Sequence, residues 1–158
     1  MIVKLEKEHL PECLDVIRKS FSTEVEKLGL NEQNCPDHIG FAKMEKLEYH
    51  LNCGVHMYGL YDNKQLIGHI SLSEKENGVF DLYNLSVLPE HRNNGYGTFM
   101  LNFAKVKVRE MGGKKITVAI IEKNTILRDW YRVNGFVQRG TKRYEHLPYP
   151  VRYMEWKS

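Results

Sequence analysis

A short turn between a buried strand and a helix constrains this chain more than any other stretch. The apolar run Phe80 to Leu88 predicts the strand, Thr98 to Met111 predicts the helix, and Arg92-Asn93-Asn94-Gly95-Tyr96-Gly97 lies between them. A helix start presents backbone N–H groups without intrahelical partners, and its dipole favours an anion. Glycines let a ligand approach the backbone, and Arg92 adds a planar donor fork suited to phosphate. The turn predicts a phosphate site, although strand-to-helix turns also use glycine for geometric reasons alone.

Length and composition limit the remaining possibilities. The 158 residues are enough for a single domain, 1–158, and 42% hydrophobic with 27% charged residues is typical of a globular protein. No apolar run approaches the roughly 20 residues of a membrane helix, and the first residues lead into charge, so we expect a cytoplasmic protein without a membrane partner. The net charge of +3 is spread along the chain, which disfavours nucleic-acid binding.

The cysteines and histidines give no sign of a metal site or of a disulfide framework. Cys13, Cys35 and Cys53 are odd in number and form no CxxC pair, and the seven histidines are scattered. We therefore expect no metal, and we expect the three thiols to be structural and buried.

Hydrophobic periodicity and turn residues predict eleven elements in the order β-α-α-β-β-β-α-β-α-β-β. Their ranges are a strand at 2–5, helices at 10–29 and 41–51, strands at 55–61, 66–72 and 80–88, a helix at 98–111, a strand at 115–121, a helix at 124–134, and strands at 136–144 and 151–157. The middle three strands are joined by short turns and form an antiparallel meander. The helix after 80–88 makes 115–121 parallel to that strand, so the fold is α/β with a mixed sheet.

Three kinds of phosphate site compete for the glycine turn. A Walker-type loop is excluded because the chain has no Gly-Lys-Ser/Thr string. A dinucleotide fingerprint lacks its third glycine near Met100, although Glu122 ends the next strand where a ribose-binding acid would lie, so a nicotinamide-dependent oxidoreductase stays a weak alternative. The third possibility is acetyl-CoA.

The segment Val87 to Gly97 resembles the acyl-CoA motif of GNAT-type N-acetyltransferases. That family pattern is a strand ending near Val-x-Pro, then Arg/Gln-x-x-Gly-x-Gly/Ala, then a helix. A second segment agrees, since Asn124, Tyr131 seven residues later, and Asn134-Gly135-Phe136 resemble the family's second cofactor segment. With the element order, the resemblance covers nearly the whole chain. It implies a GNAT-like fold in which the central pair of parallel strands splays apart.

The resemblance also implies roles for individual residues. The pyrophosphate of coenzyme A would be bound by the turn residues Arg92, Asn93, Asn94, Gly95, Tyr96, Gly97 and Thr98. Pantetheine would lie between the splayed strands and bond to the backbone of Ser86 and Val87, with the Val87 N–H facing the thioester oxygen. Asn124 would contact the pantetheine arm, and Tyr131 would protonate the departing thiolate as general acid.

Two of these residues have equally ordinary structural roles. Asparagine is a frequent helix N-cap, so Asn124 fits capping as well as cofactor binding. Tyr131 lies beside Trp130 and fits a core aromatic whose hydroxyl finds a partner.

The acceptor side is less defined by the sequence. An alkylammonium must lose a proton before it attacks a thioester, so a base or a water chain is required. Asp81 is our candidate for the base, because part of the family has an acid at a similar place before the glycine turn. Further candidates for the acceptor pocket are Tyr83, Asn84, Glu48, His50, Tyr144 and His146.

The sequence thus predicts a cytoplasmic N-acetyltransferase that moves an acetyl group from acetyl-CoA to a primary amine by direct attack in a ternary complex. The acceptor is a small molecule or a protein amine. Because the cysteines lie outside the cofactor segments, no acetyl-cysteine step is implied. The alternatives are a non-catalytic sensor or assembly subunit that binds coenzyme A or another nucleotide. The strand pair 136–156 offers a surface for a homodimer.

Overall fold

A seven-stranded mixed sheet runs through the protein, in the order β1-β2-β3-β4-β5-β7-β6. The computed structural model describes residues 1–158. The strands are β1 Ile2–Lys4, β2 His56–Asp62, β3 Gln65–Glu74, β4 Val79–Val87, β5 Lys115–Ile121, β6 Val137–Arg143 and β7 Pro150–Lys157. The helices are α1 Leu10–Lys27, α2 Met44–Asn52, α3 Tyr96–Glu110 and α4 Thr125–Val133.

This element order confirms the α/β prediction, and the crossover through α3 makes β4 and β5 parallel as expected. The predicted helix at 41–51 is displaced, because α2 begins only at Met44. The residues before it form a separate single turn, Ile39–Phe41, and the His38 side chain caps that turn by accepting from the Gly40 N–H at 2.9 Å. Periodicity gave no sign of the strand order at the carboxyl end, where β7 lies between β5 and β6.

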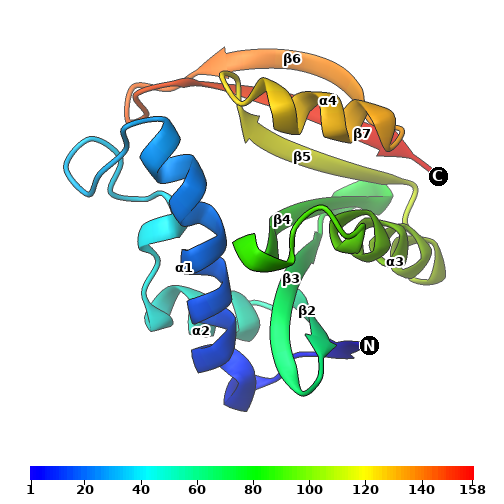
Figure 1. Ribbon diagram of the computed structural model, residues 1–158. Coiled ribbons are helices and arrows are strands. Elements are labelled where there is room, and N and C mark those ends of the chain that lie inside the picture. The colour runs from blue at the N-terminus through cyan, green and yellow to red at the C-terminus, as the bar shows by residue number, and fades with distance from the viewer.

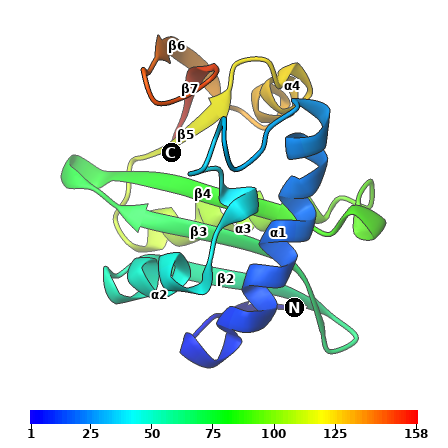
Figure 2. The same ribbon diagram turned by 90° about the vertical axis from the view of Figure 1, so that its left-hand side faces the viewer.

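Helices cover both faces of the sheet. Figure 2 shows α1 and α2 in front of β2, β3 and β4, with α3 behind them. Two apolar clusters result: one joins α1 and α2 to β2 and β3, and the other joins α3 and α4 to β4, β5 and β7. The sheet is therefore buried on both faces in its middle, while β6 at the edge is largely exposed.

The two central strands separate soon after they meet. Only Val79–Asp81 of β4 pair with Lys115–Thr117 of β5, and from there the strands diverge. Figure 1 shows the divergence: β5 leaves the β4 side of the sheet and rises with β6, β7 and α4. The predicted splayed parallel pair is present. It opens a gap in the middle of an otherwise continuous sheet.

A β-bulge in β4 accompanies the gap. His69 pairs with Ser86 and Ser71 pairs with Tyr83, so two residues of β4, Asn84 and Leu85, lie opposite one residue of β3. Asn84 has a φ of 55°, a left-handed conformation that asparagine tolerates better than most residues. A bulge bends its strand and redirects its side chains. The bend lies where β4 leaves β5.

A buried polar chain fastens α1 to β3. The Cys13 Sγ lies 3.1 Å from the Nδ1 of His69, and the His69 Nε2 lies 2.6 Å from the Ser71 Oγ. All three side chains are buried. Burial lowers the pKa of His69 to about 3 and raises the pKa of Cys13 to about 12, so both groups are neutral near pH 7.

The other two thiols differ from each other. Cys35 is buried, as expected, but Cys53 is exposed at the end of α2, which corrects the expectation of three buried thiols.

None of the helices combines the length and apolar character that a membrane crossing requires.

Candidate active site

Two adjoining cavities occupy the gap between β4 and β5 and its mouth. The turn cavity, about 470 Å³, is bounded by the turn 91–98, the end of α1 and the start of α4. The strand cavity, about 490 Å³, lies between the diverging parts of β4 and β5. Four residues line both: Phe21, Glu24, Leu85 and Leu127. The cavities therefore meet beside α1.

The start of α3 forms the floor of the turn cavity. The first intrahelical hydrogen bond runs from the Phe99 N–H to the Gly95 carbonyl at 3.0 Å, so the N–H groups of Tyr96, Gly97 and Thr98 have no partner within the helix. Gly95 has a φ of 78°, which most residues adopt only with strain. The glycine turn thus has the geometry predicted for an anion site, and these N–H groups fit a diphosphate.

The Arg92 side chain, which the sequence analysis assigned to phosphate binding, makes most of its hydrogen bonds to the protein itself. Its guanidinium donates to the Val87 carbonyl at 3.2 Å, to the Thr23 hydroxyl at 2.9 Å and to the Ser20 carbonyl at 2.7 Å. Burial lowers the pKa of Arg92 below its usual value. The side chain therefore ties the turn to α1 with four of its five N–H donors, and its charge and one N–H remain for an anion.

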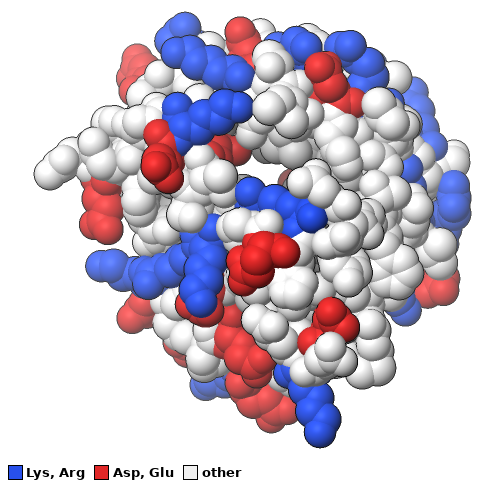
Figure 3. All heavy atoms as spheres, viewed as in Figure 1, with Lys and Arg blue, Asp and Glu red and all other residues white.

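A second cation stands at the same mouth. Lys27, in the last turn of α1, lines the turn cavity with Arg92. Figure 3 shows Lys and Arg side chains beside the hollow between the two halves of the molecule. The turn cavity is basic at its mouth, as a polyanionic ligand requires.

Asn124 performs the capping role that the sequence left open. Its Oδ1 accepts from the Leu127 N–H at 3.2 Å, which caps α4, and its Nδ2 donates to the Glu24 Oε2 at 2.8 Å. The residue also lines the turn cavity. Capping is observed, and the contact with pantetheine stays a prediction.

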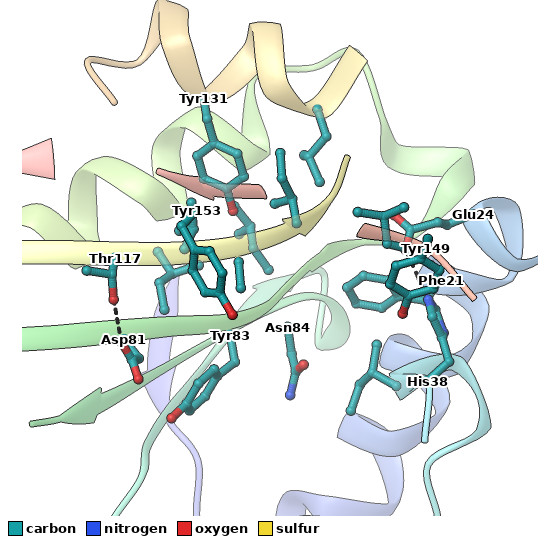
Figure 4. A pocket seen from close by; sticks show the side chains of 18 of the residues that line it. Phe21, Glu24, His38, Asp81, Tyr83, Asn84, Thr117, Tyr131, Tyr149 and Tyr153 are labelled. Carbon is teal, nitrogen blue, oxygen red and sulfur yellow. Dashed lines mark hydrogen bonds and ion pairs between the residues drawn. The ribbon is translucent and has the colours of Figure 1, made fainter. Parts of the chain in front are cut away.

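Tyr131 points from α4 into the strand cavity, as Figure 4 shows. Its ring packs against Trp130 and Phe136, with centroids 5.0 and 5.1 Å away. Burial raises the pKa of Tyr131, so the hydroxyl holds its proton near neutral pH. A protonated hydroxyl at this place is what a general acid requires, although the ring is also part of the core.

Asp81 lies at the narrow end of the strand cavity, where β4 and β5 are still paired. The Thr117 hydroxyl donates to its Oδ1, and the Lys75 Nζ lies 4.0 Å from its Oδ2. Beyond it along β4, the Nδ2 of Asn84 is buried without a hydrogen-bond partner. The bulge thus places an unpaired amide donor in the same cavity wall, where a ligand or a water can accept from it.

The structure adds residues that the sequence reasoning missed. Glu24, His38, Tyr149 and Tyr153 line the strand cavity, whereas Glu48, His50, Tyr144 and His146 do not. Of the four residues that do not line the cavity, two contact residues of its wall: His50 stacks on Tyr83, and the Tyr144 hydroxyl bonds to that of Tyr153. The available signal for Glu24 was its place one turn after Phe21, on the face of α1 that meets the sheet.

Glu122, the residue behind the nicotinamide alternative, lines neither cavity. Its N–H bonds to the Pro150 carbonyl at 3.0 Å, so its backbone belongs to the connection between β5 and β7. The position gives a ribose-binding role no geometric support.

Comparisons with known proteins agree with this geometry. A sequence model described as the acetyltransferase (GNAT) family matches residues 18–136. The chain therefore belongs to this family, which confirms the resemblance read from the glycine turn. An uncharacterized N-acetyltransferase of Brevibacillus brevis is 39% identical over a match of 59 residues, with a coverage of 30% of this chain and only 37% of that relative's length.

Solved structures show the same fold at low identity. The PaiA N-acetyltransferase of Thermoplasma acidophilum, in complex with coenzyme A, has a TM-score of 0.83 at 21% identity, covering 100% of this chain and 98% of its own. The ribosomal-protein-S18-alanine N-acetyltransferase of Escherichia coli has a TM-score of 0.80 at 14% identity, covering 99% and 92%. These similarities confirm the predicted fold class.

Proposed function

We propose that this protein is a cytoplasmic N-acetyltransferase that moves the acetyl group of acetyl-CoA to a primary amine of a small molecule or a protein. The observation that carries the proposal is the joining of an anion-binding helix start to a gap between parallel strands. The turn cavity fits the diphosphate, and the strand cavity has room for a thioester and an amine. Structural neighbours include proteins named for alanine acetylation and for a coenzyme A complex, which supports this class of donor and acceptor.

In the proposed complex, the diphosphate lies on the N–H groups at the start of α3, in the charge field of Arg92 and Lys27. The pantetheine arm passes Asn124 and runs along Ser86 and Val87 into the gap. Three further turn residues, Asn93, Tyr96 and Thr98, line the site around the diphosphate. Asn94 does not line the turn cavity, and its side chain instead holds the turn by donating to the His91 and Arg92 carbonyls at 3.1 and 3.3 Å. The Val87 N–H then faces the thioester oxygen and stabilises the charge that develops there.

The proposed reaction is direct attack. The neutral amine nitrogen forms a bond to the thioester carbonyl carbon, and the C–S bond breaks as the tetrahedral intermediate collapses. Asp81, directly or through water, takes the proton that the ammonium loses before attack. Tyr131 gives its proton to the departing thiolate, and the second proton of the attacking nitrogen, released as the amide forms, returns through water to Tyr131. The engagement of Asp81 by Thr117 and Lys75 makes a water-mediated path more suitable than direct contact.

Calorimetry with acetyl-CoA tests the donor, and an amine panel assayed by thiol release tests turnover. We expect saturable binding and thiol release that depends on an amine. Absence of binding at millimolar acetyl-CoA would refute the donor assignment. Binding without thiol release from any amine would instead favour the sensor or assembly subunit.

A further inference from the structure

Glu24 stands where the two cavities meet, and no predicted role uses it. It is one of the four residues that line both cavities, and its carboxylate is the only acidic group among them. Its side chain is 15% exposed, so the charge is held mostly out of water. A buried carboxylate is costly unless it is paired, and such groups gather at functional sites. The Glu24 carboxylate therefore needs hydrogen-bond donors from the protein or from a ligand.

Two neighbours orient this carboxylate without neutralising it. The His38 Nε2 lies 3.0 Å from Oε1, and the Asn124 Nδ2 donates to Oε2 at 2.8 Å. Because the Nδ1 of His38 accepts from the Gly40 N–H, the neutral imidazole carries its proton on Nε2 and donates it to Glu24. An ionised carboxylate has about four acceptor sites, so about two remain for another donor. The two donors are fixed by different elements, because His38 caps the Ile39–Phe41 turn and Asn124 caps α4.

The surrounding wall favours a cation. The strand cavity is lined by three carboxylates, those of Glu24, Asp37 and Asp81, and by no lysine or arginine. Asp81 already has Lys75 and Thr117 as partners, and Asp37 is exposed at the rim. Figure 4 shows Glu24 and His38 grouped with Phe21 and Tyr149 at one end of the cavity, apart from Asp81. Aromatic side chains beside a carboxylate suit an alkylammonium, whose methylenes and charge each find a contact.

We propose that Glu24 binds the ammonium group of the acceptor and that His38 and Asn124 position its carboxylate. This inference rests on the proposed function and deepens it, because it names the residue that selects a cationic amine. The carboxylate lies where the two cavities meet, beside the proposed path of pantetheine past Asn124. Asp81 lies toward the other end of the strand cavity (Figure 4), so in this arrangement the ammonium proton reaches it through water. His38 and Asn124 act through Glu24 and are positioning residues in this respect.

The test uses n-butylammonium chloride as the probe, with sodium chloride and n-butanol as controls for ionic strength and for the apolar chain. Thermal unfolding midpoints of the parent and of Glu24→Gln are measured with and without coenzyme A. Glutamine keeps the size of the side chain and one acceptor oxygen, which can serve Asn124 or His38 but not both, and it removes the charge. Glu26→Gln, an exposed residue of the same helix, is the matched control.

We expect n-butylammonium, but not n-butanol, to stabilise the parent and Glu26→Gln. Glu24→Gln should bind the probe at least about tenfold more weakly, because a hydrogen bond to a charged group contributes about that factor or more. The proposal would be overturned if n-butylammonium stabilised Glu24→Gln and the parent equally. It would also be overturned if the probe did not stabilise the parent, either with or without coenzyme A. Glu24→Asp, which keeps the charge, should recover part of the binding, and a merely structural role would not show this rescue.

Failure of the proposed function gives a different result. Coenzyme A binding is measured separately by calorimetry, and we expect Glu24→Gln to keep the parent's affinity within about threefold, since Asn124 retains an oxygen acceptor at position 24. A parent that binds the ammonium probe but not coenzyme A would refute the donor assignment and leave the ammonium site standing. A parent that binds coenzyme A but not the ammonium probe would support the donor assignment and refute the ammonium site.

Discussion

The buried His69 makes the protein sensitive to acid in a way that can be calculated. Its pKa is about 3 in the folded protein because burial disfavours the imidazolium, against an ordinary value of 6.5 in the unfolded chain. Above pH 6.5 both states hold a neutral imidazole, so this group contributes nothing to the pH dependence. Below pH 6.5 only the unfolded state takes up the proton. The free energy of unfolding therefore decreases as the pH is lowered from 6.5 to about 3.

The magnitude follows from the difference in pKa. Each pH unit below 6.5 lowers the free energy of unfolding by about 1.36 kcal/mol. At pH 4.5, two units below, the loss is roughly 2.7 kcal/mol, which is a large part of the 5–15 kcal/mol that stabilises a typical domain. The full loss, on the order of 5 kcal/mol, is reached only near pH 3.

The assay is urea unfolding of the parent and of His69→Gln at several pH values from 7.5 to 4.5. We expect His69→Gln to be less stable than the parent at pH 7.5, because it disturbs the contacts with Cys13 and Ser71. Between pH 7.5 and 4.5, however, its free energy of unfolding should decrease by about 2.7 kcal/mol less than that of the parent. His146→Gln, at an exposed position, should keep the parent's pH dependence. Equal pH dependence of the parent and His69→Gln would refute the argument. If His69→Gln does not fold, NMR of the parent decides: one of the seven histidines should not titrate above pH 4.5.

Three further substitutions test the proposed site and the packing beside it. Tyr131→Phe should lower kcat about 100-fold or more while acetyl-CoA affinity, measured by calorimetry, is nearly kept; an unchanged kcat would exclude the hydroxyl as the acid. Gly97→Leu should weaken acetyl-CoA binding by about tenfold or more without unfolding the chain, since the added Cβ would lie a tight 3.3 Å from the Trp130 ring, which is only partly buried and has the turn cavity to shift into; normal affinity would contradict the assignment of the turn. Gly113→Ala should destabilise the protein by about 1–3 kcal/mol in urea unfolding, because a Cβ there would lie 2.4 Å from Val108 and 2.7 Å from Phe80; a change within 0.5 kcal/mol, about that of an ordinary surface substitution, would contradict the packing.

The parts that the sequence predicts well are those determined by local patterns. Apolar spacing places α1, α3 and the strands, and the glycine turn places the start of α3 within two residues, at Tyr96 and not Thr98. The boundary of α2 was missed because a single residue, His38, caps a preceding turn through its side chain. A side-chain cap of that kind leaves no periodic signal.

The acceptor side of the site depends on contacts between distant residues. Glu24 and Asn124 are 100 positions apart, and His38 reaches Glu24 from a loop. The bulge at Asn84, which turns that amide into the cavity wall, follows from the pairing of β4 with β3 and not from the residues of β4 alone. Such features emerge only when the chain is folded, so the sequence could predict a site for the donor but not the wall of the strand cavity that we propose faces the acceptor.

The short pairing of β4 with β5 has a consequence for hydrogen exchange. Beyond Asp81 and Thr117, the amides on the facing edges of the two strands have no strand opposite them, although the outer edges remain paired with β3 and β7. Those inner amides should exchange with solvent rapidly beside neighbours that exchange slowly. A ligand lying in the gap would slow exchange on both edges together. Protection across the middle of this sheet is thus a property that the chain acquires only in a complex.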